Sequence, residues 1–281
     1  MRGVGRSSAA ISIVNAIPTG IGCAHGVRLY AAAVLELEPR DTTQVNVEPA
    51  ASQTPVVLRS LETAFSRLHP GGGFLAHLQL DSEIPVAKGL KSSSAVATAT
   101  IRAAADALRS PLGPLEVARM AAQVGREVGV SATGAFDDAL AGLVPGFVVT
   151  DNRTGELLRR SAADPDWTAV VHVPAGTHPA SPSVAERFRR RAAEAEGAAR
   201  SARDGSWSDA MEQNTILVER VMGYDYRDIR ERLRNLGAVA SGVSGLGPAL
   251  VSLVPQARAP AVLDSLPPER FMVPLTSEEH P

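Results

Sequence analysis

One short segment concentrates side chains suited to binding phosphate. Only two of the chain's 28 basic residues are lysines, Lys88 and Lys91, and both lie in the segment Pro85-Val-Ala-Lys-Gly-Leu-Lys-Ser-Ser-Ser-Ala95. A lysine ammonium is a compact, mobile charge, unlike the planar guanidinium used elsewhere in this sequence. Gly89 lets the backbone approach a ligand closely. The hydroxyls of Ser92–Ser94 could donate to phosphate oxygens or coordinate Mg²⁺. This composition predicts a phosphate-binding loop.

The residues after this loop predict a helix over 92–108, rich in alanine and ending before Ser110-Pro111. The free N–H groups and the dipole at its start would attract an anion. Two simpler interpretations stay open: the three serines are good helix N-caps, and two surface lysines can fall together by chance. The loop is not a Walker motif, because Leu90 separates Gly89 from Lys91 and no glycine lies five residues before Gly89.

A second segment, Thr133-Gly-Ala-Phe-Asp-Asp-Ala139, carries two adjacent carboxylates. A positioned carboxylate can accept the proton of a hydroxyl that attacks phosphorus. Aspartate is also a preferred N-cap, and a helix continues through Ala139-Leu-Ala-Gly142. Asp137 and Asp138 are both candidates on these grounds.

The composition excludes several function classes. The chain has 281 residues, a net charge of −2, a pI of about 6.3 and 44% hydrophobic residues. Such a balance gives no global field for nucleic acid or an anionic membrane. The run Arg187–Arg191 is interleaved with glutamates and indicates a solvated helix face. A single cysteine, Cys23, and the lack of an apolar run of about 20 residues lead us to expect a cytoplasmic protein.

The elements that must position these motifs alternate along the chain. Strand-like patterns predict strands over 9–14, 27–38, 42–48, 74–80, 167–173, 248–254 and 271–275, and a hairpin over 146–159. Neighbouring strands 27–38 and 42–48 would be joined by the turn Pro39-Arg-Asp41. Helical spacing and end signals predict helices over 55–68, 114–128, 183–203, 206–222, 225–236 and 260–266. The pattern changes after Asp164-Pro165, which predicts domains 1–163 and 164–281, the second an α+β unit.

The motifs together resemble a known family. Pro-x-x-x-Gly-Leu-x-Ser-Ser-x-Ala over 85–95 is similar to the phosphate-loop motif of the GHMP small-molecule kinases, which include galactokinase, homoserine kinase and mevalonate kinase. Lys91 departs from that motif, since most of the superfamily has glycine there. Gly-Leu-Lys-Ser-Ser-Ser-Ala resembles the archaeal-type shikimate kinase branch. Segments 15–26, 133–139 with 149–153, and 241–249 resemble the same branch, in the same order.

The resemblance implies a fold and a reaction. The fold would be the α+β, two-domain GHMP kinase fold, with an N-terminal ribosomal-protein-S5-domain-2-like domain and a C-terminal ferredoxin-like α/β sandwich. The reaction would be ATP- and Mg²⁺-dependent phosphorylation of a ring hydroxyl of shikimate in the chorismate and aromatic amino acid pathway. The partners would be small molecules, with no nucleic acid and no membrane. The oligomeric state is left open.

The resemblance also implies residue roles. Asp137 aligns with the family's catalytic carboxylate, with Asp138 as the alternative, and Ser93 is the candidate for Mg²⁺. The loop residues expected to bind ATP are Pro85, Val86, Ala87, Lys88, Gly89, Leu90, Lys91, Ser92, Ser93, Ser94 and Ala95. The residues expected to contact the acceptor are Asn15, Thr19, Gly22, His25, Arg153 and Gly245.

Several alternatives accompany these roles. His25 has a structural interpretation as a core histidine, and Arg153 is equally explained by the turn chemistry of Asp151–Gly155. The glycines near Gly245 fit an ordinary turn before a strand. For the whole protein, the alternatives are a sister kinase acting on homoserine or a shikimate-like cyclitol, and a sensor of the same fold without turnover. A serine hydrolase built on Ser92–Ser94 lacks a base and an orienting group.

Overall fold

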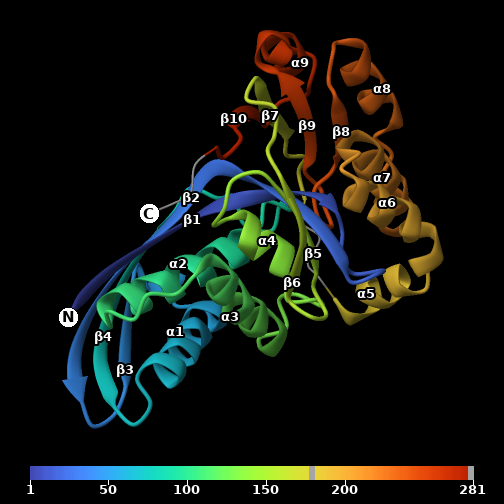
Figure 1. Ribbon diagram of the computed structural model, residues 1–281. Coiled ribbons are helices and arrows are strands. Elements are labelled where there is room, and N and C mark those ends of the chain that lie inside the picture. Colours follow the sequence, from blue (N-terminus) through green and yellow to red (C-terminus); the bar gives the residue numbers. More distant parts are fainter. Residues whose placement is uncertain (177–180, 278–281) are drawn as a thin grey trace.

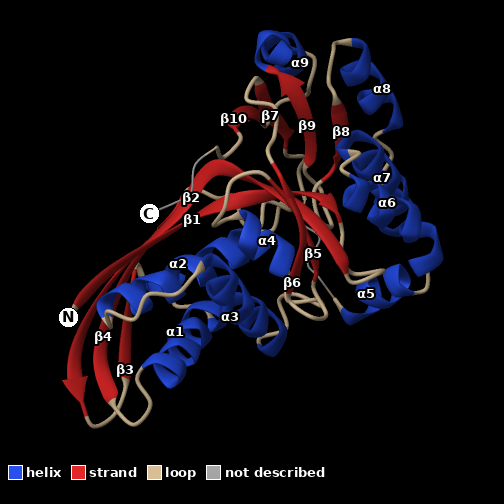
Figure 2. Ribbon diagram, in the orientation of Figure 1, coloured by secondary structure: helices blue, strands red, loops and turns tan. Residues whose placement is uncertain are grey.

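The first half of the chain folds into a six-stranded sheet covered by helices on one face (Figures 1 and 2). The computed structural model describes residues 1–176 and 181–277. The strands are β1 (Arg2–Val14), β2 (Ile21–Arg40), β3 (Gln44–Glu48), β4 (Gly73–Ser82), β5 (Phe147–Asp151) and β6 (Glu156–Ser161). Their order is β3-β4-β2-β5-β6, and β1 pairs with β2.

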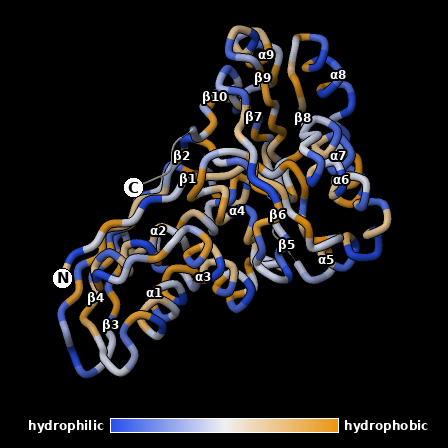
Figure 3. The backbone as a smooth tube through the Cα atoms, in the orientation of Figure 1, coloured by the Kyte–Doolittle hydropathy of each residue, from blue (hydrophilic) through white to orange (hydrophobic). Residues whose placement is uncertain are grey.

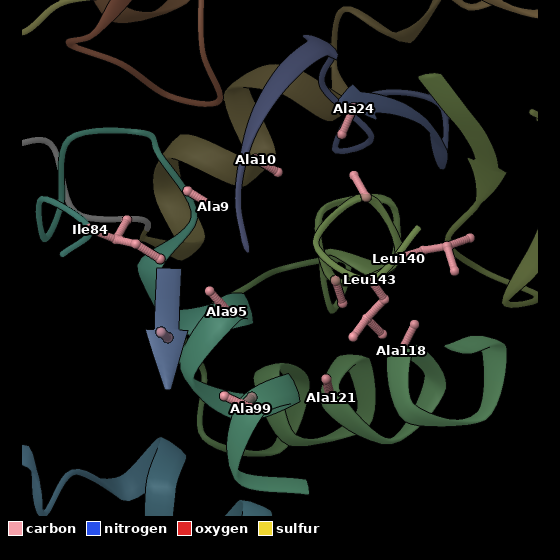
Figure 4. Close-up of a cluster of buried hydrophobic side chains, with 14 of the residues drawn as sticks. Ala9, Ala10, Ala24, Ile84, Ala95, Ala99, Ala118, Ala121, Leu140 and Leu143 are labelled. Atoms are coloured by element: carbon pink, nitrogen blue, oxygen red, sulfur yellow. The ribbon is translucent and has the colours of Figure 1, made fainter. Parts of the chain in front are cut away.

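Helices α1 (Pro55–Leu68), α2 (Ser92–Ala107), α3 (Pro114–Glu127) and α4 (Phe136–Ala141) gather beside this sheet (Figure 1). Helix α2 lies closest because β1 carries glycine where the two backbones meet. A Cβ added at Gly3 would lie 2.1 Å from the Ala107 nitrogen, and one at Gly5 would lie 2.1 Å from the Ala99 oxygen. Small side chains such as Ala95, Ala99 and Ala121 fill this layer (Figure 4). This close packing fixes where α2 begins, and therefore where the loop before it lies.

The second half forms a four-stranded antiparallel sheet with helices beside it. Its strands are β7 (Trp167–His172), β8 (Ala240–Val243), β9 (Leu250–Pro255) and β10 (Arg270–Pro274), in the order β10-β7-β9-β8. Its helices are α5 (Pro182–Arg189), α6 (Ala192–Asp204), α7 (Trp207–Met222), α8 (Arg227–Asn235) and α9 (Ala259–Asp264). The inner strands are largely apolar and α8 is largely polar (Figure 3). The sheets divide between Ser161 and Trp167, so a domain boundary near residue 164 stays our prediction.

Three predicted features were wrong in detail. Strands β2 and β3 are not neighbours, because β4 hydrogen-bonds to β2 and β3 pairs in parallel with β4. The single helix predicted over 183–203 is two helices, separated after Arg189. Strand β8 was expected only as part of a glycine-rich turn, yet it pairs with β9.

Candidate active site

A cavity of about 200 Å³ opens where the phosphate-loop segment meets the glycine cluster of the second half. Its lining brings together three stretches that the sequence singled out: the loop, the aspartate pair and the C-terminal glycines. The lining residues from these stretches are Ala87, Gly89, Lys91, Ser92, Ser93, Ser94, Thr133, Gly134, Ala135, Asp137, Asp138, Gly245, Leu246 and Gly247. Asn15, Ala16 and Ile17 contribute a further wall.

The loop is held against the second half by backbone contacts. Gly89 has φ +88°, and a Cβ there would lie 2.3 Å from the Ser244 carbonyl oxygen. The Ser244 hydroxyl donates to the Gly89 carbonyl at 2.7 Å and accepts from the Ser12 N–H at 3.0 Å. The Ala249 N–H donates to the Lys88 carbonyl at 3.2 Å. Glycine is therefore required at position 89 by both its conformation and its surroundings.

The start of α2 leaves its N–H groups without a capping side chain. The N-cap residue is Lys91, with φ 65°, and it makes no side-chain cap hydrogen bond. The following serines, Ser92–Ser94, line the cavity instead. The interpretation of these serines as caps alone is thus not supported, and a helix of this length offers its positive end to an anion in the cavity.

The two lysines have different surroundings. The Lys91 Nζ lies 2.9 Å from Asp138 Oδ2, with both side chains largely buried, at 17% and 5% exposure. The Lys88 Nζ donates instead to the carbonyls of Pro174 and Gly176, at 3.2 and 2.8 Å, and Lys88 does not line the cavity. Lys91 is therefore the cation of the described cavity lining, and Lys88 fastens the loop to the second half.

Several other residues of the expected ATP-binding segment do not line the cavity. Leu90 is buried in the core and Val86 is exposed, and neither lines the cavity. Pro85 and Ala95 also lie outside the lining. Within the segment, the cavity is thus formed by the turn residues and by the first turn of α2.

Asp137 lies buried at the base of the cavity, in the first turn of α4. A Cβ at Gly22 would lie 2.4 Å from its Cγ, so β2 must present glycine for the carboxylate to fit. Its Oδ1 accepts a hydrogen bond of 2.7 Å from Asn152 Nδ2. Burial, and then the charge of Asp138, raise the pKa of Asp137 to about 7, against the opposing attraction of Lys91. Such a carboxyl can both accept and release a proton near neutral pH.

Two of the expected acceptor residues line the cavity. Asn15 and Gly245 meet there, with Asn15 Nδ2 3.4 Å from the Gly245 carbonyl oxygen. Gly22 lies beneath Asp137 and shapes the site from behind. Thr19 accepts from the Ile21 N–H at 3.1 Å and lies outside the lining.

The other two expected acceptor residues lie away from the cavity. His25 is buried against Phe147, and its Nδ1 lies 2.7 Å from the Gly26 carbonyl oxygen. Burial lowers the pKa of His25 to about 4. Arg153 is 67% exposed and forms an ion pair of 2.8 Å with Asp151. His25 therefore has the surroundings of a core histidine, and Arg153 has those of an arginine in a turn.

One residue of the site was missed by the sequence reasoning. Asn152 was included in a turn and in the segment 149–153 that resembles the branch, but it was given no role; it is buried and bonds to both the backbone and the carboxylate of Asp137. The available signal was an asparagine at the end of a buried apolar strand, and such a signal is weak in one sequence because turns favour asparagine as well.

Comparison with known proteins identifies the class. Residues 56–146 match the GHMP kinases N terminal domain, and residues 195–271 match the GHMP kinases C terminal domain. The structure resembles the mevalonate kinase of Methanococcus jannaschii, with a TM-score of 0.73, 14% identity and 99% of each chain covered. It also resembles the homoserine kinase of Cytophaga hutchinsonii, with a TM-score of 0.67, 15% identity, and 98% of this chain and 95% of that chain covered. The chain belongs to the GHMP kinases.

Within that family, the sequence is similar to proteins named shikimate kinase. The one from Pyrococcus furiosus is 34% identical over 253 residues, covering 90% of this chain and 92% of that protein. The one from Methanocella arvoryzae is 35% identical over 254 residues, covering 90% and 85%. These relatives confirm the resemblance to the archaeal-type branch. No helix of the described residues has the length and apolarity to cross a membrane.

Proposed function

We propose that the protein transfers the γ-phosphoryl group of ATP to a ring hydroxyl of shikimate, giving shikimate 3-phosphate. The observation that carries this proposal is that Asp137 and the phosphate loop line one cavity, in a chain whose relatives are named shikimate kinase. Phosphoryl transfer requires charge neutralisation, alignment and a path for the acceptor proton. The residues of the cavity supply each of these.

The triphosphate would lie against the loop and the start of α2. The free N–H groups of the first helical turn and the hydroxyls of Ser92–Ser94 would donate to phosphate oxygens. Lys91 would add positive charge beside them, while its bond to Asp138 holds the ammonium within the cavity. Because these donors are fixed before the ligand arrives, they stabilise the developing charge without reorganisation.

Asp137 would accept the proton of the attacking hydroxyl. A general base works best when its pKa lies near the working pH, and burial raises the pKa of Asp137 to about 7. Its Oδ1 accepts from Asn152, and we assign the proton to Oδ2, which lies over Gly22. Because Gly22 has no side chain, strand β2 leaves room for this carboxylate.

The cavity suits Mg²⁺ held together with phosphate. Among the described residues there is no group of three or more histidine, cysteine or carboxylate side chains able to hold a metal. Magnesium in kinases is commonly held by few protein oxygens together with substrate phosphates and water. The Ser93 hydroxyl, in the cavity lining, is such an oxygen and would hold the ion. The bound ion would neutralise charge on the transferred phosphoryl group.

A sister kinase with a different acceptor is the second candidate. A carboxylate such as that of shikimate would normally be received by an arginine fork, yet no arginine belongs to the described lining of the cavity. Arg153 lies outside this lining and is paired with Asp151. This observation favours an acceptor without a carboxylate, such as a cyclitol, over shikimate or homoserine, against the evidence of the relatives.

A panel assay separates the candidates. Purified protein is incubated with ATP, Mg²⁺ and, in turn, shikimate, quinate, homoserine and mevalonate, while ADP release is followed. Turnover with shikimate supports the proposal, and turnover with another acceptor alone replaces it with the sister kinase. The Asp137→Asn variant serves as the matched control for contaminating kinases. Thermal stabilisation by nucleotide without ADP from any acceptor would instead indicate a sensor.

A further inference from the structure

The side chain of Asn152 makes four hydrogen bonds, and two of them are to Asp137. Its Oδ1 accepts from the Thr150 hydroxyl at 2.7 Å and from the Asp137 N–H at 3.3 Å. Its Nδ2 donates to Asp137 Oδ1 at 2.7 Å and to the Thr133 hydroxyl at 3.3 Å. A side-chain amide has two donor hydrogens and two acceptor lone pairs, so no bonding position of Asn152 is left over.

The orientation of this amide follows from the polarity of its partners. The Asp137 N–H can only donate, and an ionised Asp137 carboxylate can only accept, so the amide oxygen must face the first and the amide nitrogen the second. The Thr150 hydroxyl must then donate to the amide oxygen. Thr150 is fully buried on β5, opposite Gly22 on β2, the strand that supports the carboxylate from behind.

We propose that Asn152 is a positioning residue, locked by Thr150, that reserves Oδ1 of Asp137 for the protein and leaves Oδ2 to accept the acceptor's proton. This inference rests on the proposed function of the site. A proton on Oδ1 of Asp137 would point at the amide N–H of Asn152, which is itself a donor, so protonation of Oδ1 is disfavoured. The same hydrogen bond favours the charged carboxylate, and it lowers the pKa of Asp137 against the larger raising effects of burial and Asp138.

The other charged and titratable groups near Asp137 come from several elements. Asp138 on α4 and Lys91 before α2 act on it directly, and the charge of Asp137 adds to burial in raising the pKa of the Cys23 thiol on β2. Arg126 on α3 donates to the Thr133 carbonyl, and Asp151 at the end of β5 is held by Arg153. None of these groups bonds to the amide of Asn152, so a change at Thr150 or Asn152 leaves their contacts in place.

The test uses two matched variants of Thr150 and one of Asn152. Thr150→Ser keeps the hydroxyl that fixes the amide, Thr150→Val removes it with little change in shape, and Asn152→Leu removes the amide. The midpoint of Asp137 is followed by carbon-13 titration of its carboxyl group in each ligand-free protein. The pH dependence of kcat and the KM for ATP are then measured with shikimate.

We expect the Asn152→Leu midpoint to rise by about one pH unit, the usual size for one lost hydrogen bond to a charged group. The acidic limb of kcat should move with it, because the base must be ionised to act, while the KM for ATP stays unchanged. In Thr150→Val the Asp137 midpoint and the acidic limb of kcat should rise by a smaller amount. In Thr150→Ser both should match the wild type.

Unchanged midpoints and limbs in folded Thr150→Val and Asn152→Leu would overturn the proposal, even if both variants melt at lower temperature, since stability alone would then explain the amide. If Asn152→Leu does not fold, the comparison of Thr150→Val with Thr150→Ser decides. Shifted midpoints without any phosphorylation of shikimate would support the role of Asn152 and refute only the proposed acceptor.

Discussion

Replacing the Asp137 carboxyl with an amide should inactivate the enzyme and, above neutral pH, stabilise the fold. The ordinary pKa of this carboxyl is 3.8, and in the folded protein it is about 7 because of burial and the charge of Asp138. A difference of about three units corresponds to roughly 4 kcal/mol of destabilisation once the group is ionised. This is a ceiling for the gain from Asp137→Asn, since the variant also loses the attraction between Asp137 and Lys91.

The sign follows from proton binding. Between about pH 4 and pH 7 the folded protein holds a proton on Asp137 that the unfolded chain has released, so this group's contribution to stability falls as pH rises. The contribution is fully present below pH 4 and is lost as pH rises through 7. The amide introduced by Asp137→Asn cannot ionise, and its oxygen can still accept from Asn152. The stability advantage of this variant should therefore be small at pH 4 and largest at pH 8.

Urea unfolding at pH 4.5 and pH 8, compared between wild type and Asp137→Asn, measures this difference directly. Asp138→Asn is the matched control: it removes the partner of the buried Lys91 ammonium, 2.9 Å away, and should destabilise the protein at both pH values. Turnover of Asp137→Asn should fall by at least about a hundredfold, with ATP binding retained. An equal stability difference at the two pH values would refute the raised pKa of the buried Asp137 carboxyl. A near-normal turnover rate of Asp137→Asn would show that Asp137 is not the base.

Three further substitutions test the loop and the strand behind the site. Gly89→Ala forces a side chain to within 2.3 Å of the Ser244 carbonyl at a φ of +88°, and it should destabilise the fold by about 1–3 kcal/mol and raise the KM for ATP; an unchanged melting temperature would show that the loop is free to move. Lys91→Met should weaken ATP binding about tenfold or more in calorimetric titration, the effect of one lost bond to a charged group; unchanged affinity would mean that the ammonium does not touch the phosphates. Gly22→Ala places a Cβ 2.4 Å from the Asp137 Cγ, so kcat should fall while ATP affinity persists, and an unchanged kcat would refute the tight fit.

Elements with strong local end signals could be predicted from the sequence. Helix α1 begins at Pro55 and ends at Leu68, as expected, because the Thr54 hydroxyl accepts from the Val57 N–H and proline fits the first turn. Helix α2 likewise begins at Ser92, since its alanine run has high helix propensity. Such features depend on residues a few positions apart, which one sequence displays.

Pairings between distant segments could not be predicted in this way. The turn after β2 suggested a hairpin with β3, but the chain reverses, crosses through α1 and returns as β4 in the place beside β2. A parallel pair such as β3 and β4 needs a crossover of this kind, and no local signal states which strand fills the gap. For the same reason the sequence did not reveal that Asn152 turns inward to Asp137, or that Lys88 and Lys91 have separate partners.

The contacts of Lys88 and Ser244 explain why the site needs both halves of the chain. The turn of the loop is fixed by donors from the second half: Ser244 to the Gly89 carbonyl, and the Ala249 N–H to the Lys88 carbonyl. The Lys88 ammonium adds two further hydrogen bonds between the halves, because it donates to the carbonyls of Pro174 and Gly176. Because these bonds set the loop backbone without a nucleotide, the free N–H groups of α2 would already be placed for the proposed phosphate. Binding of ATP at the proposed site and docking of the two halves would therefore stabilise each other, since each favours the same arrangement of the loop.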